Sequence, residues 1–219
     1  MKRIARNHVW WPGVDADIEE LVKSCSLCQQ LPPSAPQVPA SPWSYPNGPW
    51  QRIHMDYAGP VDGKMLLVIV DAFSKWPDVW IISSVSAHET IEKVRLSFAT
   101  HGLPLVVVTD NAGCFAGDEF ATFLKANGVK HLFSPPRHRA SNGQAESMVK
   151  QVKLGLKKQA PASLSVRLVR WLFKYRTTPH TTTGQTPSEL LFRRKIRTHL
   201  DLIAPSSRLK KSAENVPSG

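Results

Sequence analysis

The alternation of apolar and polar residues along the chain predicts a sheet that begins near residue 51. Gln51–Val61 places Ile53, Met55 and Tyr57 on one face and polar side chains on the other, which is the pattern of a half-buried strand. Four shorter apolar runs predict further strands, at Met65–Phe73, Val79–Val85, Leu105–Thr109 and Val129–Phe133. The first three strands follow one another through short turns, so we expect them to form an antiparallel meander.

Helical periodicity replaces the strand pattern after the meander. Apolar residues three or four positions apart predict helices at Ser86–Thr100, Asp118–Asn127, Gly143–Gln159, Ser163–Tyr175 and Pro187–Arg194. Ser86 has the side chain of an N-cap, and Gly102 is placed to end the first of these helices. Three strands, then alternating helices and strands, then helices predict an α/β fold, a five-stranded mixed sheet with helices on both faces. This order resembles that of a ribonuclease H-like fold.

The first 30 residues precede this region and differ from it. Asp15 or Asp17 is expected to cap a helix that ends near Cys25 and Cys28, which lie one turn apart. Residues 31–49 hold seven of the 18 prolines of the chain, which favour neither a helix nor a central strand. The expected organisation is a partial helical module at residues 1–30, a proline-rich linker at 31–49, a core domain at 50–203 and a frayed tail at 204–219.

Composition excludes several classes of protein. With 219 residues, 42% of them hydrophobic and 21% charged, the chain can bury a core and is not a disordered basic tail. Its longest apolar run, Met65–Val70, is far shorter than the roughly 20 residues that cross a bilayer, so no membrane span is expected. Three cysteines cannot form a disulfide framework, and the spacing of Cys25 and Cys28 suits a metal or redox pair in a reducing compartment. The chain is expected to be intracellular.

The net charge of +11 is concentrated at one end of the chain. Residues 1–136 contain 11 basic and 13 acidic side chains, whereas residues 137–219 contain 17 basic and 4 acidic ones. A surplus of this kind attracts a polyanion, of which DNA and RNA are the commonest. A solvated basic surface explains the charge equally well, so charge alone leaves both interpretations open.

Three carboxylates occupy positions that suit a metal site. Asp56 lies on the polar face of the first predicted strand, Asp110 directly follows the most buried strand, and Glu146 lies near the start of a helix. If the two strands are neighbours, the acids converge and could hold two Mg²⁺ or Mn²⁺ ions about 3.5–4 Å apart. Taken singly, each acid has a simpler interpretation, as an exposed strand residue, a turn residue or a helix-start acid. Their joint position beside a basic C-terminal third favours the metal site.

The residues around these acids form ordered motifs, with 35 residues between Asp110 and Glu146. The motifs lie at His54–Pro60, Val70–Trp76, Val108–Asn111, Ser141–Glu146, Tyr175–His180 and Thr186–Phe192. In these blocks the sequence resembles the integrases of retroviruses and of gypsy-type long-terminal-repeat retrotransposons, whose DDE triad the three acids match. The resemblance covers about residues 1–203.

The resemblance implies an enzyme, a polynucleotidyl transferase and endonuclease that performs DNA 3′-end processing and strand transfer. Asp56, Asp110 and Glu146 would be its catalytic residues and its Mg²⁺ or Mn²⁺ ligands. Backbone phosphates would be held by residues around the catalytic helix: Arg137, Arg139, Asn142, Lys150, Lys153 and Lys157. The implied partners are element DNA, target DNA and further copies of the chain, in the nucleus, with no membrane and no small-molecule cofactor. Asp71 is interpreted as structural, because it ends its strand in a turn.

The amino-terminal segment resembles the zinc-binding His-His-Cys-Cys module of the same family. Cys25 and Cys28 match its thiolate pair, but a zinc site needs four ligands and the two histidines would lie upstream of residue 1. His8 stands where the family has an aromatic residue, and it is not counted as a ligand. We therefore expect no complete zinc site, and the two cysteines are expected to pack as small hydrophobic residues.

Three functions remain open at this point. The intact triad favours an active integrase core. The missing histidines, and the lack of the small barrel or chromodomain-like module that follows the core in the family, favour a catalytically silent or host-retained descendant that binds nucleic acid. A ribonuclease that acts on RNA–DNA hybrids would share the fold, but such enzymes use four carboxylates and rarely carry Asn142, Gly143 and Gln144 before the last acid.

Overall fold

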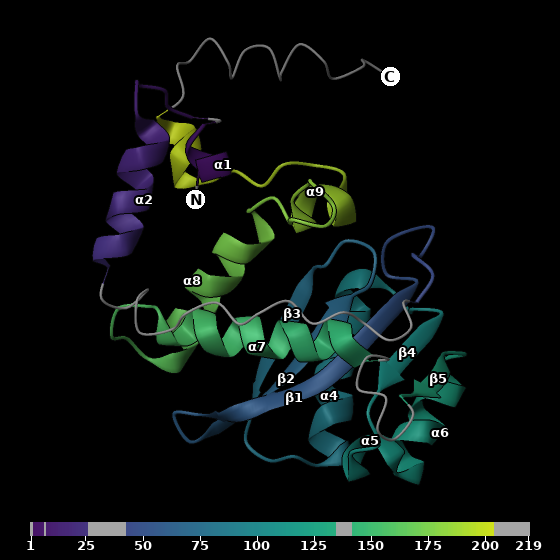
Figure 1. Ribbon diagram of the computed structural model, residues 1–219. Helices are drawn as coiled ribbons and strands as arrows, with labels where there is room; N and C mark the ends of the chain where they lie inside the picture. Colours follow the sequence, from purple (N-terminus) through teal and green to yellow (C-terminus); the bar gives the residue numbers. More distant parts are fainter. Residues whose placement is uncertain (1, 7, 26–42, 135–141, 204–219) are drawn as a thin grey trace.

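The computed structural model describes residues 2–6, 8–25, 43–134 and 142–203, and the fold is built from these (Figure 1). Several sequence predictions fall outside them, namely those for Cys28, Arg137, Arg139, most of the proline-rich linker and the tail at 204–219. In the part of the chain that the structure describes, no helix is long and apolar enough to cross a membrane.

Five strands form one mixed sheet. They are β1 (Arg52–Val61), β2 (Lys64–Asp71), β3 (Pro77–Ile82), β4 (Val106–Thr109) and β5 (Lys130–Phe133). Their order across the sheet is β3-β2-β1-β4-β5. The β1–β2 and β2–β3 pairs are antiparallel, whereas the β1–β4 and β4–β5 pairs are parallel. The predicted meander and mixed five-stranded sheet are confirmed, although β3 begins and ends earlier in the chain than predicted.

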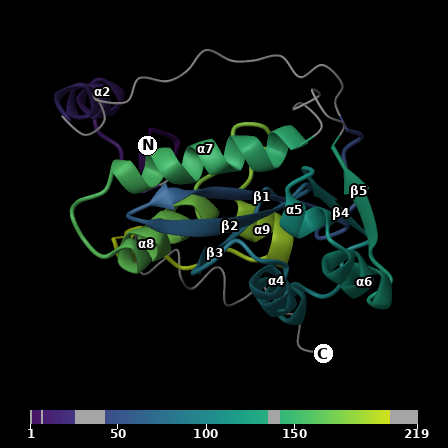
Figure 2. The same ribbon diagram turned by 90° about the horizontal axis from the view of Figure 1, so that it is seen from below.

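Helices cover both faces of this sheet (Figures 1 and 2). One face is covered by α4 (Ala87–His101), α5 (Gly113–Ala116) and α6 (Asp118–Ala126), and the other by α7 (Gly143–Lys157) and α8 (Leu164–Arg176). In β2, Leu67 and Ile69 pack toward α4–α6, and the apolar residues between and beside them pack toward α7 and α8. Because successive side chains of a strand point to opposite faces, this unbroken apolar strand requires cover on both.

Helix α4 begins and ends where the sequence predicts. The Ser86 hydroxyl accepts a hydrogen bond from the Glu89 backbone N–H at 3.2 Å, and Gly102 follows the helix with φ of 87°.

The hydrophobic periodicity of the sequence does not predict the shortest helices. Among the described residues, the elements that were not predicted are α1 (Lys2–Ala5), α5 and the 3₁₀ helix η2 (His199–Leu202), whereas α9 (Pro187–Phe192) was expected. Four residues complete about one turn, which is too little to show a period.

Helix α2 (Val14–Ser24) begins differently from the prediction. The predicted cap by Asp15 or Asp17 is wrong, because Gly13, with φ of 87°, precedes the helix and no side chain caps it. Both acids lie instead in the first turn, where the helix dipole favours negative charge.

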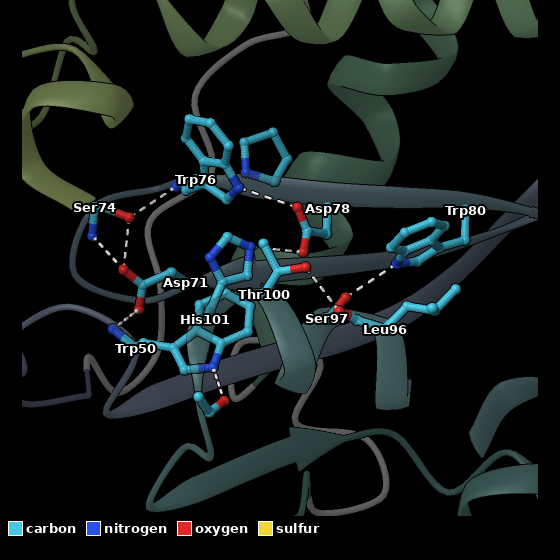
Figure 3. A network of polar contacts seen from close by, with 12 residues as sticks. Trp50, Asp71, Ser74, Trp76, Asp78, Trp80, Leu96, Ser97, Thr100 and His101 are labelled. Atoms are coloured by element: carbon cyan, nitrogen blue, oxygen red, sulfur yellow. Dashed lines mark hydrogen bonds and ion pairs between the residues drawn. The ribbon is translucent and has the colours of Figure 1, made fainter. Parts of the chain in front are cut away.

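Buried polar contacts surround the end of β2 and join β3 to helix α4 (Figure 3). Asp71, at the end of β2, accepts hydrogen bonds from the Trp50 backbone N–H at 3.0 Å and from the backbone N–H and hydroxyl of Ser74 at 2.9 and 2.6 Å. Its side chain is fully buried and holds the turn after β2 in place, so the structural interpretation of this fourth acid is confirmed. Asp78 on β3 forms a second centre, with Trp76 and His101.

Candidate active site

Strand pairing brings Asp56 and Asp110 to the same level of the sheet. β1 and β4 are parallel neighbours, with His54 opposite Val108. Continuing that register by two residues sets Asp56, within β1, level with Asp110, the first residue after β4. The condition on which the sequence-based interpretation depends, that the two strands are neighbours, is therefore met.

Helix α7 carries the third acid across the same face of the sheet (Figure 1). Glu146 lies in its first turn. Ala58, two residues after Asp56 on the same strand face, shares an apolar cluster with Ala145, the residue before Glu146. Further along the helix, the Lys153 ammonium donates a hydrogen bond to a β1 backbone carbonyl at 3.2 Å. The start of α7 is therefore packed against the strand that bears Asp56.

Asp56 is affected electrostatically by both other acids. Burial raises the pKa of Asp56 to about 6, against a hydrogen bond from the Tyr57 backbone N–H that lowers it. The charges of Asp110 and Glu146 raise this pKa further, and the charge of Lys153 lowers it. Both acids therefore lie near enough to Asp56 to oppose its ionisation, and a cation among them would relieve the repulsion.

Backbone groups engage two of the three carboxylates. One oxygen of Asp56 accepts from the Tyr57 N–H at 2.7 Å, and one oxygen of Asp110 accepts from the Ala112 N–H at 3.1 Å. Within the described ranges, no group of three or more His, Cys, Asp or Glu side chains lies close enough to hold a metal ion. The donor set suits a hard divalent cation, because each acid offers carboxylate oxygens. Their role as metal ligands stays a prediction.

The predicted DNA-contacting lysines of α7 are not equivalent. Lys150 and Lys157 are exposed and follow Glu146 by four and eleven residues, so they lie on the same side of the helix. Lys153 shares that side but is half-buried, and its ammonium is hydrogen-bonded to the Gly59 carbonyl. Two ammonium groups in line with Glu146 are thus presented to solvent.

Asn142 has a different environment from the one that its predicted role requires. Its side chain is buried: Nδ2 donates to the Met55 carbonyl at 3.0 Å, and Oδ1 lies 3.2 Å from His54 Nδ1. The prediction of a DNA contact at Asn142 is therefore wrong, because both polar groups of the side chain are used inside the protein.

The side chain of His54, for which the sequence predicts no role, is fully buried. Burial lowers its pKa to about 3, and the nearby charge of Arg52 acts in the same direction, so the imidazole is neutral at physiological pH. The signal in the sequence was its position, two residues before Asp56 and on the same strand face.

The predicted thiolate pair is described only in part. Cys25 is half-buried directly after α2, and Cys28 lies outside the described residues. The incomplete zinc site therefore stays a prediction.

Two family models match this chain. Residues 46–139 match the Integrase core domain, a range that contains Asp56 and Asp110, and residues 1–34 match the Integrase zinc binding domain, a range that contains Cys25 and Cys28.

Two curated relatives extend the match. The chain is 39% identical over 214 residues to the Uncharacterized protein K02A2.6 of Caenorhabditis elegans, which covers 96% of this chain and 17% of that protein. It is 25% identical over 201 residues to the Retrovirus-related Pol polyprotein from transposon gypsy of Drosophila melanogaster, which covers 87% of this chain and 19% of that protein. The chain thus spans only about a sixth to a fifth of the length of these relatives.

Two solved structures share the fold. A chain of the simian T-cell lymphotropic virus intasome in complex with PP2A regulatory subunit B56 gamma matches with a TM-score of 0.66 at 20% identity, covering 84% of this chain and 68% of that chain. The HTLV-2 integrase catalytic core domain in complex with magnesium, in its trimeric form, matches with a TM-score of 0.58 at 22% identity, covering 66% and 98%. By sequence family and by fold, the chain belongs to the integrases of retroviruses and retrotransposons.

Proposed function

We propose that this chain is an integrase catalytic core that processes the 3′ ends of a retrotransposon's DNA and joins them to target DNA. Integrase core domains are in general polynucleotidyl transferases that use divalent metals. The observation that carries the proposal is the position of Asp56, Asp110 and Glu146: two neighbouring strands and the helix across them supply three acids, and the charges of the other two act on Asp56.

The proposed metal ligands are these same three acids. Mg²⁺ and Mn²⁺ prefer carboxylate oxygens, and a pair of such ions stabilises the attacking and leaving oxygens of a phosphoryl transfer. The raised pKa of Asp56 supports a cation at this place, because an anion disfavoured by burial and by like charges becomes favourable beside a positive charge. The HTLV-2 core, which shares the fold, is in complex with magnesium.

Strand pairing and the packing of α7 would hold the three acids in place, and Lys153 would favour the ionised form of Asp56. The β1–β4 pairing fixes Asp56 level with Asp110, and the packing of α7 on β1 brings Glu146 to the same region. Lys153 keeps a positive charge near Asp56 while its hydrogen bond to Gly59 holds α7 along the strand. With a pKa of about 6, Asp56 is mostly ionised near neutral pH, and a bound cation would favour this ionised form further.

DNA is the proposed substrate. Lys150 and Lys157 are exposed on the side of α7 that carries Glu146, so phosphates next to the acids would continue along this helix. Arg137 and Arg139 are proposed to contribute to the same contact. Such contacts bind the backbone and leave the base sequence unread.

We further propose an oligomeric state, domain boundaries and a cellular location for this chain. The solved neighbours are an intasome and a trimeric core, which supports a homo-oligomer on DNA. The family matches end at residue 34 and begin at residue 46, which supports a boundary between a module at 1–30 and a core at 50–203 within the stretch at 31–49, with a tail at 204–219. A nuclear location follows from chromosomal DNA as the target.

A branched oligonucleotide that mimics the product of strand transfer tests the proposal. We expect the purified chain to release the joined strand in the presence of Mg²⁺ or Mn²⁺, and the Asp110→Asn variant to lose this activity. Asp118→Asn, which changes an exposed acid on α6, is the matched control and should act as the wild type does. A folded chain without activity, or activity that survives Asp110→Asn, contradicts the proposal.

A nucleic-acid-binding protein without catalysis is the second candidate function. It is favoured by the finding that, among the residues that the structure describes, no three acids lie close enough to hold a metal ion. This candidate predicts salt-dependent binding of duplex DNA that is the same with and without Mg²⁺, and no strand release in the assay above.

A further inference from the structure

Asn142 lies directly before α7 but does not cap it. An asparagine in this position usually accepts a hydrogen bond from a backbone N–H of the first helical turn. The Asn142 side chain makes no such bond. Both ends of its amide face β1 instead, Nδ2 toward the Met55 carbonyl and Oδ1 toward His54 Nδ1. The side chain therefore holds the start of the helix to the strand.

His54 supplies the donor for the Asn142 side-chain oxygen. A neutral imidazole has one N–H, and the bond to the Asn142 oxygen requires that this hydrogen be on Nδ1. The other ring nitrogen, Nε2, is buried and has no hydrogen-bond partner among the described residues. The contact with Asn142 is thus the one hydrogen bond that the structure gives this ring, and neither residue is open to solvent.

These two hydrogen bonds join the backbone segments of two acids. His54 and Met55 immediately precede Asp56, and Glu146 follows Asn142 by about one helical turn. A shift of Asn142 away from β1 would therefore carry Glu146 away from Asp56. Residues that orient metal ligands in this indirect way typically change metal affinity or activity about 10–100-fold when they are replaced.

We infer that His54 and Asn142 are positioning residues of the proposed metal site, a buried latch that holds Glu146 beside Asp56. The inference rests on the proposed function, because it assigns the latch to the three acids of that site. It differs from a general packing role in one respect: loss of the latch should weaken the response to metal more than it weakens the fold.

Two polar replacements of His54 separate these roles. His54→Asn places an amide nitrogen near the position of Nδ1 and keeps the donor to Asn142, whereas His54→Gln carries its amide one bond further, near the position of Nε2. Asn142→Ala removes the other half of the latch. The control is Asn127→Ala, which removes an asparagine whose Nδ2 donates to the Phe123 carbonyl in α6, away from the acids.

The first measurement is the Mg²⁺ concentration that gives half-maximal strand release from the branched oligonucleotide. We expect His54→Gln and Asn142→Ala to raise this concentration about 10–100-fold, and His54→Asn and Asn127→Ala to stay within about threefold of the wild type. The second measurement is amide hydrogen exchange, which should become faster in the first turn of α7 in His54→Gln and Asn142→Ala and stay unchanged in α4.

Several results would overturn the latch. These are a wild-type Mg²⁺ requirement in folded His54→Gln and Asn142→Ala, an equal rise in His54→Asn and His54→Gln, or a lower maximal rate at an unchanged Mg²⁺ requirement. If His54→Gln does not fold, Asn142→Ala decides by the same two measurements. If the wild type itself is inactive, the proposed function fails, and the exchange data alone then decide whether the latch holds α7 to β1.

Discussion

Arg176 and Asp78 form a buried ion pair that ties the last turn of α8 to β3. Arg176 Nη2 lies 3.0 Å from Asp78 Oδ1, and the Asp78 side chain is only 9% exposed. The same carboxylate is hydrogen-bonded to His101 Nε2, at the end of α4, and to the indole N–H of Trp76, each at 3.0 Å (Figure 3). The guanidinium also lies over the Trp76 ring, 4.0 Å from its centroid. One carboxylate thus joins β3 to helices on both faces of the sheet.

Replacing Asp78 by alanine should destabilise the fold strongly. The change leaves Arg176 half-buried without its counter-charge and removes an acceptor from His101 and Trp76, so we expect the free energy of unfolding to fall by about 3–5 kcal/mol. Urea unfolding followed by circular dichroism measures this. Glu92→Ala, which removes an exposed acid from α4, should change stability by about 0.5 kcal/mol or less. A loss below about 1 kcal/mol in Asp78→Ala would mean that the ion pair is not stabilising.

The same carboxylate should make stability depend on acid pH. Burial alone would raise the pKa of Asp78, but the hydrogen bond to His101, the charges of His101 and Arg176 and the Trp76 indole outweigh it, and the pKa lies below its usual value. An acid with a lowered pKa stabilises the fold above its unfolded pKa, about 3.9, and this contribution is lost as the pH falls through the folded value. Wild-type stability should therefore fall more steeply below about pH 4 than that of Asp78→Asn. Parallel slopes in urea titrations at pH 5, 4, 3 and 2 would contradict this.

Gly155 should tolerate no side chain, although it lies inside a helix. A Cβ at this position of α7 would overlap the indole ring of Trp171, which is buried on α8. Alanine normally favours a helix over glycine by about 1 kcal/mol. Here we expect Gly155→Ala to lower the free energy of unfolding by about 1–3 kcal/mol, because overpacking outweighs propensity. In the same helix, Gly143→Ala meets no atom within 4 Å and should leave stability unchanged or slightly raised.

The sequence predicts where the acids lie but not what holds them. The face of β1 that carries Asp56 follows from the alternation of Ile53 and Met55, because a strand has a fixed period of two. The bond between His54 and Asn142 joins residues 88 positions apart. An asparagine before a helix suits either a local cap or a distant partner, so its sequence context cannot decide between them.

The same limit applies to the packing of α7 on α8. Helical periodicity predicts both helices and their apolar faces, and these faces are observed. It does not indicate which turn of one helix lies against which turn of the other. The contact of Gly155 with Trp171 depends on that relative position, so glycine inside a predicted helix could be explained only from the structure.

Lys150 and Lys157 should contribute to DNA binding through phosphate contacts alone. Each phosphate contact that is removed lowers the slope of log affinity against log salt by about 0.9. We therefore expect the double variant Lys150→Ala/Lys157→Ala to lower the slope by about 2, equally for duplexes of different sequence, in fluorescence anisotropy titrations. Lys125→Ala, on α6 at the opposite face of the sheet, should leave the slope unchanged. An unchanged slope in the double variant would remove these lysines from the DNA contact.

The burial of Asp56 beside two other acids should lower the stability of the metal-free protein. A carboxyl whose folded pKa is raised, as that of Asp56 is to about 6, lowers stability as the pH rises through its unfolded and folded values. At pH 7.5 without metal, Asp56→Asn should therefore raise the free energy of unfolding by about 1–2 kcal/mol, a range that allows for the partial exposure of this side chain.

Bound metal should make the wild type more stable than Asp56→Asn, the reverse of their order without metal. At about 100 times its dissociation constant, Mn²⁺ should stabilise the wild type by about 2.7 kcal/mol, which thermal unfolding would record as a rise of several degrees, and should leave Asp56→Asn unchanged. Asp71→Asn is the matched control, because Asp71 is an acid on the neighbouring strand whose oxygens are held by backbone and hydroxyl donors. It should lose stability yet keep the full response to Mn²⁺. An Asp56→Asn variant that responds like the wild type would show that Mn²⁺ binds elsewhere, since a metal bound by the acids cannot be indifferent to the removal of one of them.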